Sequence, residues 1–282
     1  MKPVAAMRPF CEVCCPSLEA VAKAVTAGAD RIELCERLEV GGVTPSEQLI
    51  KDALAVAGAV PVNVLIRPRE GNFVYSEEEA EQMLASIELC KALRVVAGTS
   101  GPRLQANRSA SVPVGSNGKA LRVNGVVIGA LRSDGSVDMD LMRRLVDAAR
   151  PHPGDASLSH SKDAIRPLAI TFHRAFDESR DPFAALEDII SLGIERLLTS
   201  GHAPTAWEGR FVLKELVERA STHMGSESSQ ASTLQSADVA VNSSLQSTPR
   251  IVIMPGCGVT PANLPALAAF TRATEFHGSK IL

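Results

Sequence analysis

The sequence predicts an α/β fold, a single TIM barrel spanning residues 1–282, and three observations point to it. Strand-like and helix-like segments alternate along the chain, which is typical of a parallel sheet with helical crossovers. Eight strand-like segments can be counted, the number that closes such a sheet into a barrel. Polar residues gather at the carboxyl ends of these segments, where barrels carry their sites. An open, doubly wound sheet is the alternative, but no single glycine-rich phosphate turn dominates the sequence.

The predicted strands are short and apolar, and the helices between them carry apolar residues at helical spacing. Ser46 is placed to cap the second helix, and Ser76 with Glu79 has the spacing of a capping box at the third. The strands are predicted at 10–14, 31–35, 61–66, 124–130, 168–172, 196–200, 250–254 and 274–277. The helices are predicted at 17–27, 46–56, 76–93, 138–149, 182–192, 206–220 and 262–270.

Three polar segments interrupt this alternation, at 96–118, 152–165 and 224–248. They have no periodicity, and we expect each to be a disordered insert on the face of the barrel opposite the carboxyl ends of the strands. The pentapeptide Lys-Ala-Leu-Arg-Val occurs on both sides of the first segment, which is consistent with a duplication. Four histidines in or near loops are expected to be solvated surface residues: His152, His160, His202 and His223.

Composition and charge exclude several classes of function. The formal net charge of −3 and pI near 6.1 give no reason to expect binding to nucleic acid or to an anionic membrane. No apolar run is long enough to cross a membrane, and the first residues lack the apolar core of a signal peptide. We therefore expect a cytoplasmic protein, in which the six cysteines are reduced and available for metal binding or catalysis.

Two successive predicted strands each carry a Glu-x-Cys pair, Glu12 with Cys14 and Glu33 with Cys35. Because side chains alternate along a strand, Glu33 and Cys35 share one face, while Ile32 and Leu34 occupy the other. By the same parity, Cys11 and Cys15 lie on the face opposite Cys14. Two soft thiolates on neighbouring strands suit Cu(I), so Cys14 and Cys35 are the candidate metal ligands. The alternative is a pair of inert core thiols.

A second group of residues suggests an anion site. Arg67 and Arg69 follow the third strand, where they could clamp a carboxylate or phosphate, or instead pair with Glu12 and Glu33 in a buried ion network. His173 is a candidate general acid or base, with Glu12 or Glu33 as a proton-transfer partner. The remaining anion-binding candidates are Arg174, Gly256, Gly258 and His277. No organic cofactor is predicted.

Several longer motifs resemble the CutC family. They are EVC at 12–14, GADRIELC at 28–35, GGVTPS at 41–46, IRPREGNFVYS at 66–76, ITFHRAFD at 170–177, LTSG at 198–201, MPGCGV at 254–259 and EFHGS at 275–279. The resemblance implies a TIM barrel, a cytoplasmic homo-oligomer, a role in copper homeostasis and Cu(I) ligands at Cys14 and Cys35. The chain departs from the family pattern at Cys257 and Glu70, where glycine is usual. It also ends soon after the last motif, so we expect the barrel to lack its final helix.

Two functions follow as predictions. The first is a copper homeostasis protein that binds Cu(I) through paired cysteines. The alternative is a TIM-barrel enzyme acting on a small anionic metabolite that bears a phosphate or a carboxylate. A pure scaffold role is a third option, and the number of polar residues expected in the interior argues against it.

Overall fold

The computed structural model describes residues 8–96, 120–150, 167–221 and 250–282. The predicted inserts at 152–165 and 224–248 lie outside these residues, as do His152, His160 and His223. The sequence predicts an insert from Val96, but Val96 belongs to β4 (Val95–Val96), which pairs with β5 (Ala120–Leu121) in a short antiparallel ladder. The rest of that predicted insert also lies outside the described residues.

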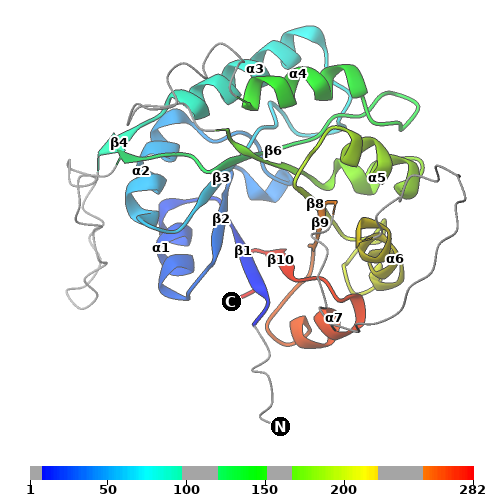
Figure 1. Ribbon diagram of the computed structural model, residues 1–282. Coiled ribbons are helices and arrows are strands. Elements are labelled where there is room, and N and C mark those ends of the chain that lie inside the picture. The colour runs from blue at the N-terminus through cyan, green and yellow to red at the C-terminus, as the bar shows by residue number, and fades with distance from the viewer. Residues whose placement is uncertain (1–7, 97–119, 151–166, 222–249) are drawn as a thin grey trace, which may run out of the picture.

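Eight parallel strands form a nearly closed barrel, as the alternation of segments predicts. Their order is β10-β1-β2-β3-β6-β7-β8-β9, and β9 and β10, at the two ends of this order, lie beside each other. Figure 1 shows the strands at the centre with helices around them. The strands are β1 (Phe10–Cys15), β2 (Arg31–Leu34), β3 (Val62–Leu65), β6 (Gly125–Ile128), β7 (Ala169–Phe172), β8 (Arg196–Thr199), β9 (Val252–Pro255) and β10 (Glu275–Gly278).

Seven α-helices connect these strands within the described residues, and 279–282 after β10 form none. The Ser46 cap and the Ser76–Glu79 capping box are both present. The helix predicted from Ala206 begins instead at Arg210, because Gly209 packs against the backbone of Ser200 and Gly201 in a preceding turn. The helices are α1 (Leu18–Thr26), α2 (Glu47–Ala57), α3 (Glu77–Ala92), α4 (Met139–Ala149), α5 (Pro182–Ser191), α6 (Arg210–Ser221) and α7 (Leu264–Thr271). No helix of the described residues has the length and apolar character to cross a membrane.

The two faces of each strand belong to different environments. Ile32 and Leu34 of β2 belong to the large apolar layer between the strands and the helices, as do Cys11 and Cys15 of β1. The opposite face points into the barrel, where a small second cluster contains Cys14, Cys35, Leu65 and Val127. The parity predicted for Cys14 and for Glu33 with Cys35 is therefore confirmed, and it carries polar and thiol groups into the barrel interior.

Candidate functional site

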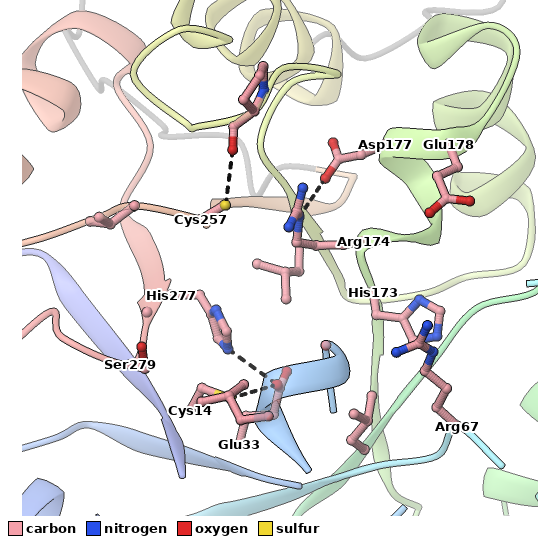
Figure 2. Close-up of a pocket in the computed structure, with 18 of the residues that line it drawn as sticks. Cys14, Glu33, Arg67, His173, Arg174, Asp177, Glu178, Cys257, His277 and Ser279 are labelled. Carbon is pink, nitrogen blue, oxygen red and sulfur yellow. Dashed lines mark hydrogen bonds and ion pairs between the residues drawn. The ribbon is translucent and has the colours of Figure 1, made fainter. Parts of the chain in front are cut away.

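A cavity of about 710 Å³ opens at the carboxyl ends of the strands. Figure 2 shows side chains from several strands directed into it. Seven of the eleven candidate site residues line this cavity: Cys14, Glu33, Arg67, His173, Arg174, Gly258 and His277. Four others do not line it: Glu12, Cys35, Arg69 and Gly256. The site is thus assembled at the predicted end of the barrel, from a subset of the predicted residues.

The thiol of Cys14, at the cavity, is in contact with the thiol of Cys35, which lies behind the lining. The Sγ atoms of Cys14 and Cys35 lie 3.7 Å apart, and Cys14 Sγ lies 3.5 Å from Glu33 Oε1, to which it can donate. The hydrogen bond with Cys35, burial and the Glu33 carboxylate together raise the pKa of Cys14 well above its ordinary value. Cys14 therefore holds its proton at neutral pH.

Glu33 and His277 form a buried pair above these thiols. His277 Nε2 lies 3.3 Å from Glu33 Oε1, an interaction drawn in Figure 2. Burial disfavours the charged form of both groups, but the attraction between them has the larger effect. The pKa of His277 is therefore raised and the pKa of Glu33 is lowered. Ligand atoms of Cys14, Glu33 and His277 lie within 4.8 Å of one another, so these three side chains could also hold a metal ion.

Glu12 lies deeper in the barrel, and its ion-pair partner is not one of the arginines considered in the sequence analysis. It is fully buried and forms an ion pair with Arg31, which also donates to Glu275 over 2.7 Å. The alternative pairing of Arg67 or Arg69 with Glu12 and Glu33 is not observed. Arg31 was missed, although a signal was available: it lies two residues before Glu33, so it shares the inward face of β2.

Arg67 and Arg69 point in different directions. Arg69 makes a salt bridge to Glu79 of α3 over 2.5 Å and donates to the carbonyls of Asn72 and Val74. Arg67 is buried at the cavity and donates to the carbonyl oxygens of Val40, Gly42 and Gly71. No carboxylate among the described residues forms an ion pair with Arg67, a buried cation that contacts backbone carbonyl oxygens and the Phe73 ring.

The segment after β7 supplies His173 and Arg174 to the cavity. His173 is buried, and burial together with the Arg67 charge lowers its pKa to about 4. Arg174 begins a short 3₁₀ helix (Arg174–Glu178) and donates to Asp177 over 2.8 Å. The Asp177 carboxylate in turn accepts from the backbone N–H of Ser200, which ties this segment to the end of β8.

His202 is not the solvated surface residue that the sequence suggests. It lines the cavity with a half-buried ring, its Nε2 lies 3.2 Å from Ser179 Oγ, and it packs edge-on against Phe176. The error has a physical reason, because the loop after β8 folds back over the cavity. No periodicity marks such a loop in the sequence.

The loop after β9 completes the cavity with Cys257 and Gly258. Both residues have positive φ, 71° for Cys257 and 72° for Gly258, and the first value is unusual for a residue with a side chain. Gly256 lies behind the lining. A Cβ atom there would come within 2.4 Å of Leu198, so this glycine leaves room for the Leu198 side chain, and the His277 ring lies next to it at 3.4 Å.

Comparison with known proteins identifies relatives of the whole chain. The family model described as the CutC family matches residues 10–114 and 116–228. A CutC family protein of Parabacteroides distasonis is 37% identical over 273 residues, which are 97% of this chain and 83% of that protein. The human copper homeostasis protein cutC homolog is 36% identical over 271 residues, 95% of this chain and 72% of the human protein.

A solved structure shares the architecture. The crystal structure titled as the copper homeostasis protein CutC from Streptococcus agalactiae superposes with a TM-score of 0.67 and 25% identity, covering 98% of this chain and 100% of that one. The chain therefore belongs to the CutC family of copper homeostasis proteins.

Proposed function

We propose that this protein binds Cu(I) through the thiols of Cys14 and Cys35. The observation that carries the proposal is the 3.7 Å separation of the two sulfur atoms, inside the barrel and beside the cavity. Thiolates are the ligands that Cu(I) prefers, and Cu(I) accepts few of them. The human relative's description as a copper homeostasis protein supports the same reading. The cytoplasmic location and the homo-oligomer stay predictions from the sequence.

An anaerobic Cu(I) titration tests this site. We expect Cys14→Ala/Cys35→Ala to weaken Cu(I) binding by more than about 10-fold, since it removes both soft ligands. The matched control is Cys15→Ala, which removes a buried thiol of the same strand from the face that packs against the helices. Unchanged Cu(I) affinity in the double variant would reject the site. A loss in His277→Gln but not in Cys35→Ala would favour the set formed by Cys14, Glu33 and His277 instead.

We infer a second function for the cavity, the binding and turnover of a small anionic metabolite. A volume of about 710 Å³ exceeds what one metal ion needs and falls in the range of metabolite pockets. The buried Arg67 cation has no carboxylate partner among the described residues, and such a charge is costly unless a ligand offsets it. Arg174, Gly258 and His277 line the same cavity and are the further anion-binding candidates.

Calorimetric titration with inorganic phosphate and short dicarboxylates tests this second function. We expect Arg67→Met to weaken anion binding by about 10-fold or more, because it removes the buried charge. Arg69→Met is the matched control, since Arg69 lies outside the cavity lining and is engaged by Glu79. Equal losses in the two variants, or no binding of any probe to the wild type, would argue against an anion site here.

A further inference from the structure

The His173 ring is closely packed by three neighbouring residues. It packs on Phe73, with centroids 5.0 Å apart, and lies edge-on to Phe172 at 6.0 Å. Gly129 leaves room for the His173 ring, because a Cβ atom at position 129 would come within 2.7 Å of the ring atoms Cε1 and Nδ1. The ring is therefore fixed in place by Gly129 just after β6, by Phe172 of β7 and by Phe73 in the loop after β3.

The hydrogen bond at Nδ1 settles which nitrogen carries the proton. The backbone N–H of Ala175 donates to Nδ1 over 3.1 Å. A backbone N–H can only donate, so Nδ1 must be bare and the proton of the neutral ring must sit on Nε2. A second proton, at Nδ1, would point at the Ala175 N–H and break this bond.

Nε2 is the unpartnered end of the ring. It is buried, has no hydrogen-bond partner among the described residues, and belongs to a side chain that lines the cavity. His173 as a whole is only 5% exposed, so bulk water cannot easily satisfy this N–H group. A buried donor left unpaired is costly, which points to a ligand atom as its partner.

Arg67 places positive charge near the His173 ring. Its guanidinium carbon lies 4.9 Å from the centroid of the Phe73 ring, the same ring on which His173 packs. Figure 2 draws the two side chains next to each other at the cavity. The charge of Arg67 opposes protonation of His173, so the pair combines one cation with one neutral N–H donor.

We propose that His173 Nε2–H and the Arg67 guanidinium form an oxyanion-binding corner for a carboxylate or polarised carbonyl oxygen of a small ligand. The inference rests on the small-anion function proposed above and names the chemistry of its ligand. It also gives His173 a role different from the general acid or base predicted from the sequence. The lone pair of Nδ1 already accepts the hydrogen bond from the Ala175 N–H, so neither ring nitrogen is free to accept a proton. His173 therefore acts as a hydrogen-bond donor, through Nε2–H, to the oxygen of the ligand.

The test combines histidine ¹⁵N NMR with binding of oxalate, malonate and inorganic phosphate. We expect His173 to give the spectrum of a neutral Nε2–H tautomer that stays unchanged from about pH 5.5 to about pH 8. A carboxylate probe should shift its Nε2 resonance. His173→Ala should weaken carboxylate binding by about 10-fold to 100-fold, the range for a hydrogen bond to a charged group. His173→Gln keeps an N–H donor and should recover most of that loss.

His202→Gln is the comparison variant. It changes an imidazole of the same cavity whose Nε2 already has Ser179 as a partner, and we expect less than about a threefold change in carboxylate affinity. Carboxylate binding that is undiminished in His173→Ala, or an Nδ1–H tautomer, would overturn the inference while leaving the small-anion function standing. Absence of binding by every probe to the wild type would overturn both.

Discussion

The Sγ atoms of Cys14 and Cys35 lie 3.7 Å apart, although 21 positions separate the two residues in the sequence. The contact exists because β1 and β2 pair in parallel with Cys14 opposite Glu33, which brings Cys35 just beyond Cys14 on the same inward face. A thiol buried beside another thiol and a carboxylate resists losing its proton, and the pKa of Cys14 is raised accordingly. This protonation couples metal binding to pH.

We expect Cu(I) affinity to increase with pH. Cu(I) binds thiolate, so it must displace the Cys14 proton. For each proton displaced, the Cu(I) affinity should increase by about 10-fold per unit rise in pH. Anaerobic competition titrations between about pH 6 and about pH 8 measure this slope, and a proton-release assay with a pH indicator measures it independently. A Cu(I) affinity that does not vary with pH would mean that the metal binds without the Cys14 thiolate.

Glu12→Gln should mainly reduce stability. Glu12 is fully buried and neutralises Arg31, which is itself 3% exposed. Loss of that negative charge leaves Arg31 with Glu275 alone and should cost about 3 kcal/mol of unfolding free energy in urea denaturation. The control is Glu19→Gln, which removes an exposed partner of Lys23 and should leave the stability nearly unchanged. If Glu12→Gln instead left stability intact and abolished anion binding, Glu12 would act on the ligand directly.

The parity of one strand predicted much of this site. Ile32 and Leu34 alternate with Glu33 and Cys35, and that alternation alone assigns the last two to the barrel interior. Arg31 obeys the same parity, so the partner of Glu12 could have been found in the same way. The location of the cavity followed from the barrel itself, because parallel strands end at one rim.

Parity gives no information beyond the end of a strand. β3 ends at Leu65, so Arg67 and Arg69 take their directions from the loop that follows and from Glu79 of α3, which lies 10 residues further along the chain. The orientation of His173 depends on a backbone N–H two residues later and on Gly129, just after β6, and neither contact is marked in the sequence. These contacts depend on tertiary packing and could not be predicted locally.

Gly129→Ala should destabilise the protein through the His173 ring. The added Cβ would lie 2.7 Å from His173 Nδ1 and 3.2 Å from Phe172, so the ring must shift, at a cost of about 1–3 kcal/mol. A double-mutant cycle isolates the contact: in the His173→Ala background the same substitution should cost at least about 1 kcal/mol less. Equal costs in the two backgrounds would show that the strain lies elsewhere, for example against Phe172.

His173 should make the protein less stable in acid. Its pKa is about 4 in the folded state, lowered first by burial, and about 6.5 in the unfolded chain. Between these values the unfolded state binds a proton that the folded state excludes, so stability falls as the pH falls through this window. The raised pKa of His277 acts in the opposite direction, because its contribution is present at low pH and is lost as the pH rises.

Comparing the pH dependence of stability in the wild type and in His173→Gln therefore isolates the contribution of His173. His173→Gln cannot titrate but leaves Glu33 and His277 in place. We expect the wild type to lose about 2–3 kcal/mol more unfolding free energy than His173→Gln between about pH 7.5 and about pH 4.5, measured by urea denaturation. Parallel pH profiles of the two proteins would show that His173 has the same pKa in the folded and unfolded states, since only a ring kept neutral by burial and by Arg67 makes the wild type the steeper of the two.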